Sequence, residues 1–197
     1  MRRPRIAALL VDLDGTLADT EALNVEAYAA ALAEAGHAIA PDRLRVVIQG
    51  RSWRDFLPGL VGPEGDPAAI AARKRAIYTE RVHAAAMNAS LVALLRRHHG
   101  RCRTGLVTTA ARASTLRYLA RPELDGLFDC VVTGDDVTRH KPDPEAYRRA
   151  ADILGVAPAS CLVFEDSPAG LLAARRFGAR TITVLHPARV DGQAVAP

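Results

Sequence analysis

The sequence has few cysteines, and none has the spacing of a metal or redox motif. Cys102, Cys130 and Cys161 stand alone, without a C-x-x-C pair. Zinc sites and dithiol centres use closely spaced cysteines, so the sequence argues against both. Each cysteine lies in a strand-like stretch, and we expect all three to be reduced residues of the core.

Aromatic residues and lysine are also scarce. Aromatics make up 5% of the chain, and 24 of the 26 basic residues are arginine, leaving only Lys74 and Lys141 as lysine. The net charge of +4 and the pI near 9.3 raise the question of nucleic acid. The arginines are spread along the chain, however, and do not form a basic stripe with stacking aromatics. We therefore expect no nucleic-acid partner.

No apolar run has the length of a transmembrane helix. The run Ile6–Val11 follows basic residues, as in a signal peptide, but Asp12 interrupts it and no small-residue cleavage site follows. We expect a cytoplasmic protein with no membrane partner. Its 197 residues suit one domain, or one domain with an insert. The oligomeric state, monomer or dimer, stays open.

The stretch IAALLVDLDGT organises the chain. Its apolar run predicts a strand buried on both faces, as in a parallel sheet. Side chains alternate along a strand, so Asp12 and Asp14 project to the same side, and Gly15 lets the chain turn away. Two adjacent carboxylates at the carboxyl end of a strand indicate a bound cation or one protonated carboxyl. The plain alternative is a capping aspartate followed by an Asp-Gly turn.

Helical and strand patterns then separate along the chain. Residues 20–87 read as all-helical, with helices expected at Glu21–Gly36, Pro41–Gln49, Ser52–Leu60 and Ala68–Ala86. From Ala89 onward, helices alternate with strands expected at Arg103–Thr108, Phe128–Thr133, Cys161–Phe164 and Thr181–Leu185. This order predicts an α/β fold: a three-layer, parallel-sheet, Rossmann-like core of residues 1–19 and 88–197, with an inserted all-helical cap of residues 20–87.

Polar residues follow four of the expected strands. Asp12 and Asp14 follow the first, Thr108 and Thr109 the second, Lys141 comes after the third, and Glu165 and Asp166 follow the fourth. Carboxylates, hydroxyls and an ammonium at one sheet edge are the groups needed to hold Mg²⁺ and a phosphoryl group.

Four segments carrying these residues, VDLDGTLADT, LVTTA, HKPDP and VFEDSPAG, occur in the order and spacing of the four motifs of the haloacid dehalogenase superfamily. The chain most resembles its beta-phosphoglucomutase-like and phosphoglycolate phosphatase-like members, which have a helical cap in the same place. The resemblance covers nearly the whole chain.

The resemblance implies a role for each motif residue. Asp12 resembles the nucleophile that forms an aspartyl-phosphate, and Asp14 resembles the general acid/base, its backbone carbonyl also a metal ligand. Asp166 resembles the third Mg²⁺ anchor, with Glu165 beside it as a further or outer ligand. Thr108 and the Thr109 amide would hold the phosphoryl oxygens.

Lys141 also stands out on physical grounds. In a chain that uses arginine almost everywhere, a solvated surface cation would be arginine. A compact ammonium fits among carboxylates and phosphate where a planar guanidinium does not. In the cap, Arg51 and Arg54 are candidate substrate contacts, although a solvated helix explains them equally well. Asn24 is a third candidate, and it stands where related sugar mutases carry histidine.

These features favour a Mg²⁺-dependent phosphatase of a small phosphorylated metabolite. A sugar phosphomutase of the same fold is the alternative, and Asn24 argues against it. A dehalogenase would not need Asp14, and a non-catalytic binding protein would be expected to carry a broken motif.

Overall fold

The computed structural model describes residues 5–48 and 53–186. The chain divides into two compact units, Met1–Asp19 with Ala86–Pro197, and Thr20–Ala85. We call the first the core unit and the second the helical unit. In the described part of the chain, no helix combines the length and apolar character that crossing a membrane requires.

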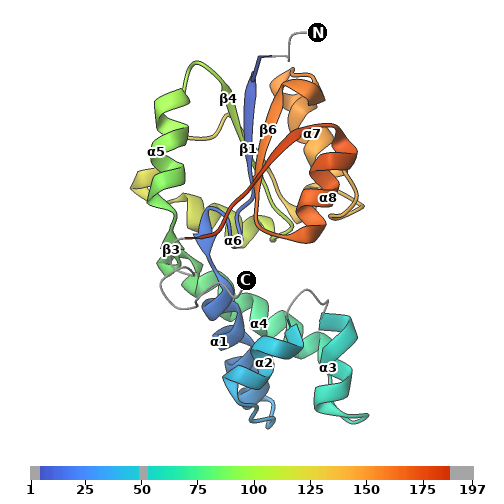
Figure 1. Ribbon diagram of the computed structural model, residues 1–197. Helices are drawn as coiled ribbons and strands as arrows, with labels where there is room; N and C mark the ends of the chain where they lie inside the picture. Colours follow the sequence, from blue (N-terminus) through green and yellow to red (C-terminus); the bar gives the residue numbers. More distant parts are fainter. Residues whose placement is uncertain (1–4, 49–52, 187–197) are drawn as a thin grey trace, which may run out of the picture. The chain divides into compact units, whose positions relative to one another are not determined.

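The core unit is built on a five-stranded parallel sheet with the order β5-β4-β1-β6-β7. α7 and α8 pack together on one face of this sheet. Because crossovers between parallel strands are almost always right-handed, α5 and α6 are expected on the other face. Figure 1 shows α5 and α8 on opposite sides of the strands, so the predicted three-layer Rossmann-like α/β core is confirmed. The strands are β1 (Ala8–Val11), β4 (Arg103–Val107), β5 (Cys130–Val132), β6 (Cys161–Glu165) and β7 (Arg180–Thr183). The helices are α5 (Ala89–His98), α6 (Arg112–Leu119), α7 (Glu145–Leu154) and α8 (Pro168–Phe177).

β1 occupies the centre of the sheet, and this position explains its sequence. All four of its residues are buried, because helices cover both faces of the sheet. Val11 is level with Leu106 of β4 on one side and with Phe164 of β6 on the other. The connections run from β1 first toward β5 and later toward β7. In open α/β sheets, ligands bind at such a reversal, at the carboxyl ends of the strands, which here is directly after Val11.

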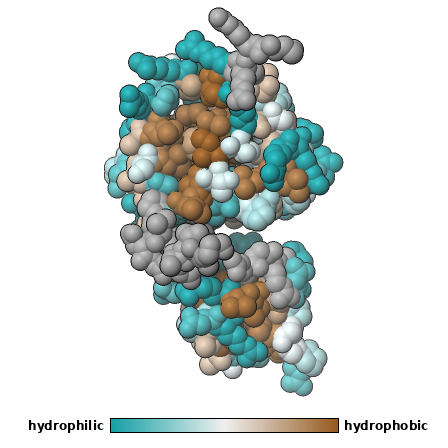
Figure 2. Space-filling view, in the orientation of Figure 1, coloured by the Kyte–Doolittle hydropathy of each residue, from teal (hydrophilic) through white to brown (hydrophobic). Residues whose placement is uncertain are grey.

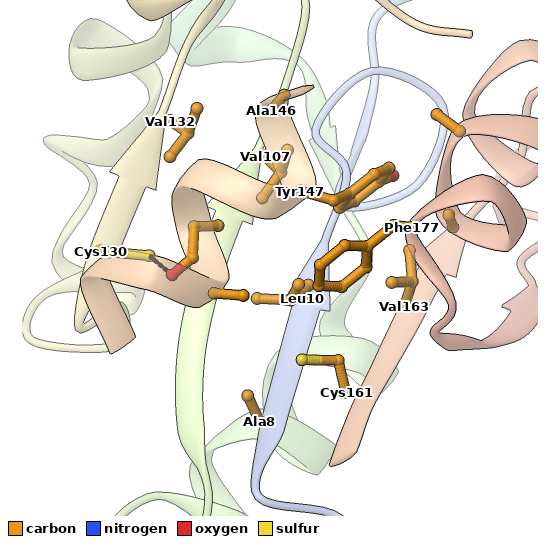
Figure 3. Packing of buried hydrophobic residues seen from close by; sticks show 14 residues of the cluster. Ala8, Leu10, Val107, Cys130, Val132, Ala146, Tyr147, Cys161, Val163 and Phe177 are labelled. Atoms are coloured by element: carbon orange, nitrogen blue, oxygen red, sulfur yellow. Dashed lines mark hydrogen bonds between the residues drawn. The ribbon is translucent and has the colours of Figure 1, made fainter. Parts of the chain in front are cut away.

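The α7–α8 face of the sheet carries the main apolar cluster of the core unit. Small residues on α7 let this helix approach the strands closely, and Tyr147 fills the space toward the carboxyl edge. Its ring lies 6.2 Å from that of Phe177, and both residues belong to the same cluster as Leu10 (Figure 3). Figure 2 shows further hydrophobic residues on the surface of this unit, rimmed by hydrophilic ones.

The helical unit contains α1 (Glu21–Glu34), α2 (Pro41–Ile48), α3 (Trp53–Val61) and α4 (Pro67–Arg81). α1 packs mainly against α4, and the rings of Tyr28 and Phe56 meet edge to face at 5.2 Å. The Nζ atom of Lys74 lies 4.9 Å from the ring centre of Tyr28 and 4.5 Å from that of Tyr78. One of the two lysines is thus placed over aromatic faces, which attract a cation.

The predicted helical insert is confirmed, because the elements described between Thr20 and Ala85 are all helices. The helix expected at Ala68–Ala86 is too long, because α4 ends at Arg81 and is followed by the 3₁₀ turn Val82–Ala84 and by strand β3 (Ala86–Met87) of the core unit. β3 pairs antiparallel with β2 (Ala18–Asp19), which the sequence also did not suggest. Two-residue strands are too short to produce a hydrophobic period. Gln49 and Ser52, where two predicted helices end and begin, lie outside the described residues.

Packing over β1 leads to a stability prediction. Leu10 is fully buried in the apolar cluster, so Leu10→Ala should lower the free energy of unfolding by about 2–5 kcal/mol through lost contacts and the resulting cavity. Ile153→Ala on α7, where the side chain is 56% exposed, should stay within about 0.5 kcal/mol. Urea unfolding of both variants measures the difference, and equal losses would contradict this account of the core.

Candidate active site

Polar side chains gather at the carboxyl edge of the sheet because three neighbouring strands end there. Asp12 follows β1, Thr108 follows β4, and Asp166 follows β6. Backbone hydrogen bonds hold these ends in register: the Asp12 amide donates to the Phe164 carbonyl, and the Thr108 amide donates to the Val132 carbonyl. Asp12, Thr108 and Glu165, the last residue of β6, are buried. The strands therefore fix the backbone of the site.

Lys141 reaches this edge from the loop between β5 and α7. Its Nζ atom donates to Asp12 Oδ1 at 2.5 Å, to Glu165 Oε1 at 2.6 Å and to the Val107 carbonyl at 3.1 Å. The side chain is only 5% exposed. An ammonium has three protons, and these three acceptors match them in number. Lys141 is therefore a buried cation at the centre of the site.

Glu165 is held from both sides. Besides Lys141, its Oε1 accepts a hydrogen bond from the Tyr147 hydroxyl at 3.4 Å, and its Oε2 accepts from the Ser167 amide and hydroxyl at 2.8 and 3.0 Å. Gly170 on α8 makes room for it, because a Cβ atom there would lie 1.6 Å from Oε1. Both carboxylate oxygens thus have donors, which favours a role in holding Lys141.

Asp12, Glu165 and Asp166 form an acidic group whose oxygens lie within 4.8 Å of one another. Thr16, which is fully buried, donates a hydrogen bond to Asp166 Oδ1 at 3.2 Å. Carboxylate oxygens are the ligands that Mg²⁺ prefers. The arrangement could hold a metal ion, and Asp12 and Asp166 are its best ligands because the oxygens of Glu165 already serve other donors.

Asp14 lies beside Thr108, whose hydroxyl is 3.4 Å from Asp14 Oδ2. The same hydroxyl accepts a hydrogen bond from the Ala110 amide at 3.0 Å. Thr109 is exposed on this turn. The predicted acid/base and the predicted phosphate-binding hydroxyl are thus neighbours in the structure.

Charge in the site is unevenly balanced. Burial raises the pKa of the Asp12 carboxyl well above its usual value; the Lys141 ammonium lowers it, and the charges of Glu165 and Asp14 raise it further. Burial alone would lower the pKa of Lys141, but the surrounding negative charges, Asp12 first among them, raise it well above its usual value. Lys141 therefore stays protonated, and an additional cation would favour the ionised form of Asp12.

The cap candidates belong to the helical unit and are described within it. Asn24 is half-buried on α1, and its backbone amide donates to the Thr20 carbonyl. Arg54 is exposed on α3, with its guanidinium carbon 4.4 Å from the ring centre of Trp53. Arg51 lies outside the described residues.

Sequence reasoning gave no role to three residues that shape the site. Thr16 and Ser167 lie inside the quoted motifs, and their hydroxyls next to carboxylates could have drawn attention. Tyr147 has no sequence signal, because its place beside Glu165 depends on how α7 packs on the sheet.

Comparison with known proteins places these features in a family. The model of the haloacid dehalogenase-like hydrolase family matches residues 9–184. The chain is 32% identical over 191 residues to validoxylamine A 7'-phosphate phosphatase of Streptomyces hygroscopicus subsp. limoneus, covering 94% of this chain and 89% of that protein. It is 32% identical over 186 residues to fructose-1-phosphate phosphatase YqaB of Escherichia coli, covering 91% and 97%.

A solved structure extends the comparison to three dimensions. CbbY from Rhodobacter sphaeroides, crystallised in complex with phosphate, superimposes with a TM-score of 0.76 at 26% identity, covering 90% of this chain and 85% of that one. Family model and relatives agree over almost the whole length. The chain belongs to the haloacid dehalogenase-like hydrolase family and is an enzyme of its phosphoric monoester hydrolase type.

Proposed function

We propose that this chain is a Mg²⁺-dependent phosphatase that hydrolyses a small phosphorylated metabolite through an aspartyl-phosphate on Asp12. The observation that carries the proposal is the buried contact of Lys141 with Asp12 and Glu165, beside Asp166 and the Asp14–Thr108 pair. This arrangement joins a nucleophile, an acid/base and a cation in one place. The family match supports the same chemistry.

Asp12 is the nucleophile in this scheme. Lys141 holds its Oδ1 atom at 2.5 Å, and we assign the attack on phosphorus to Oδ2. Because Oδ1 is held, the orientation of Oδ2 toward the phosphorus atom is fixed. A correctly oriented nucleophile lowers the barrier of a transfer step. The P–O bond to the leaving group breaks as the bond to Asp12 forms, and the leaving oxygen takes a proton from Asp14.

Asp14 then acts in the opposite direction. In the second step it removes a proton from water, the water attacks phosphorus, and Asp12 is released with inorganic phosphate. Thr108 would donate its hydroxyl proton to a phosphoryl oxygen. In the structure this hydroxyl oxygen lies 3.4 Å from Asp14 Oδ2, and a bound phosphoryl group would replace this long contact with a shorter one.

The acidic group fits Mg²⁺. Asp12 and Asp166 would provide carboxylate oxygens, and the backbone carbonyl oxygen of Asp14 would be the third protein ligand. When bound, the cation would offset the repulsion between the carboxylates and a phosphate dianion. Glu165 serves this site indirectly, through Lys141.

The substrate class follows from the relatives. Their names specify validoxylamine A 7'-phosphate and fructose-1-phosphate, and we propose a phosphorylated carbohydrate for this chain. A phosphomutase would share the first transfer but would return the phosphoryl group to sugar. Release of phosphate in single-turnover experiments, with and without a sugar bisphosphate, distinguishes the two: a phosphatase needs no bisphosphate.

The nucleophile assignment can be tested with Asp12→Asn. The amide is a poor nucleophile, so phosphate release should fall to background, while circular dichroism should match the wild type because asparagine can still accept from Lys141. A screen of sugar phosphates with MgCl₂ present measures the activity. Phosphate release at the wild-type rate would refute the role of Asp12.

Removal of divalent metal is the second test. EDTA should abolish turnover and MgCl₂ should restore it. Without a metal ion, the carboxylates of Asp12, Asp14 and Asp166 would repel the phosphate group of the substrate. Asp166→Asn should raise the Mg²⁺ concentration for half-maximal activity on the order of 10-fold or more. Asp125→Asn, at an exposed position of the core unit, is the control and should leave the Mg²⁺ requirement unchanged. Full activity in EDTA would exclude the metal.

Lys141→Arg tests whether shape matters as well as charge. The guanidinium is wider than the ammonium and cannot meet the same three acceptors, and misplacing a group by about 1 Å can cost on the order of 10²-fold in rate. The loss should appear mainly in kcat if Lys141 acts on the charge that develops during transfer.

Arg139→Lys is the matched control for this substitution. Arg139 lies two residues away, its side chain is 66% exposed, and it pairs with Asp143 and Glu145. We expect kcat and KM close to wild type. Similar effects at both positions would refute a specific role of the Lys141 ammonium in the reaction.

A further inference from the structure

The turn that follows β4 is held by a second loop with no part in the scheme above. This turn, Thr108–Ala111, leads into α6, whose N-cap residue Ala111 makes no side-chain cap. The missing cap comes from another part of the chain: Asp135 Oδ2 accepts a hydrogen bond from the Arg112 amide at 2.8 Å. Asp135 belongs to the 3₁₀ turn Gly134–Asp136 after β5. The start of α6 is thus capped by its neighbour.

Asp136, the next residue, adds an ion pair. Its Oδ1 accepts a charged hydrogen bond from the Arg112 guanidinium, and its Oδ2 accepts from the amide and hydroxyl of Thr133 at 2.8 and 2.7 Å. The bond from the Thr133 amide is one half of a capping box, which fixes the position of the Asp136 carboxylate. Asp136 therefore presents a rigid acceptor.

Gly134 brings the two backbones together. Its amide donates to the Ala110 carbonyl at 2.9 Å. A Cβ atom at Gly134 would lie 2.4 Å from the Thr109 carbonyl oxygen, a backbone atom with little freedom to move. Only glycine allows this approach. With the two aspartates, it makes three contacts from Gly134–Asp136 to Thr109–Arg112, which we call the clasp.

We propose that the clasp positions the phosphate-binding turn, making Asp135 and Asp136 positioning residues for the reaction; the proposal rests on the function proposed above. Thr108 can hold a phosphoryl oxygen only if its turn keeps its shape when an anion arrives. At its start, the turn is held by the Thr108 amide bond to the Val132 carbonyl, the Ala110 amide bond to the Thr108 hydroxyl and the long contact of Thr108 with Asp14. The clasp adds support from another loop, at Ala110 and Arg112.

The chain offers a matched control at the other end of β4. Asp129 accepts hydrogen bonds from the Thr104 amide at 2.7 Å, the Thr104 hydroxyl at 3.2 Å and the Arg103 guanidinium at 3.2 Å. This is the same set of donors that Asp136 uses: a threonine amide, a threonine hydroxyl and an arginine. Thr104 and Arg103 lie at the amino end of the strand, away from the catalytic edge. Asp129→Asn and Asp136→Asn therefore remove similar interactions at opposite ends of β4.

The experiment compares these two variants of the full chain with the wild type. Binding of inorganic phosphate in MgCl₂ is measured by calorimetry, and hydrogen–deuterium exchange is measured on peptides covering residues 108–112. Asp136→Asn should raise the Kd for phosphate about tenfold, the effect of losing one charge-assisted hydrogen bond, and should speed exchange in 108–112. Asp129→Asn should change neither, although both variants lose thermal stability.

A double variant tests the ion pair itself. Arg112→Gln with Asp136→Asn should weaken phosphate binding no more than Asp136→Asn alone, because the two residues act as one unit. Additive losses would overturn the pairing. Phosphate affinity equal to wild type in Asp136→Asn, or equal losses in Asp129→Asn, would overturn the positioning role.

The wild-type measurements distinguish failure of the proposed phosphatase function from failure of the clasp. A wild type that neither binds phosphate nor hydrolyses phosphate esters would refute the proposed phosphatase, and with it the clasp's role. A wild type that does both, with Asp136→Asn behaving identically, would refute the clasp alone.

Discussion

A single buried ammonium joins the ends of three strands. Lys141 contacts Asp12 after β1, the Val107 carbonyl at the end of β4 and Glu165 at the end of β6. These strands are adjacent in the sheet, and Lys141 itself comes from the loop after β5. A buried charge is costly to desolvate and stable only when its partners are fixed. Here the strands fix the backbone of these partners. Ser167 and Tyr147 donate hydrogen bonds to Glu165, and Gly170 leaves room for its side chain.

The same edge shows how a fold concentrates like charges. Parallel strands end together, so residues distant in sequence bring their carboxylates within reach of one another. Burial then strengthens both the repulsion among them and their attraction to a cation. Lys141 offsets part of this negative charge permanently. The remaining carboxylates form an acidic group that could hold a further cation.

Much of this arrangement could be predicted from the sequence. The apolar run before Asp12 indicated a buried strand, and the positions of Thr108 and Asp166 after later apolar runs indicated the same edge. Lys141 stood out because the chain otherwise uses arginine. The inferences about the strands agree with the structure because strand period and strand ends are local properties, visible within a few residues.

The rest depends on contacts between separate segments. Nothing near Glu165 in sequence indicates that Lys141 and Tyr147 share its Oε1 atom. Likewise, nothing in the sequence of Gly134–Asp136 indicates that these residues contact the turn before α6. β2 and β3 escaped notice because two residues cannot show a period. Hydrogen bonds across loops carry no repeating signal, so they appear only when the chain is folded.

The two lysines have a practical consequence for handling the protein. Lys141 is almost closed to solvent, and Lys74 is half-buried over two tyrosine rings. Amine-reactive dyes, cross-linkers and coupling resins attack lysine side chains, so the folded protein offers them Lys74 alone among its side-chain amines. Under mild conditions such reagents would modify Lys74 of the helical unit, besides the α-amino group of the chain, and would leave Lys141 unmodified.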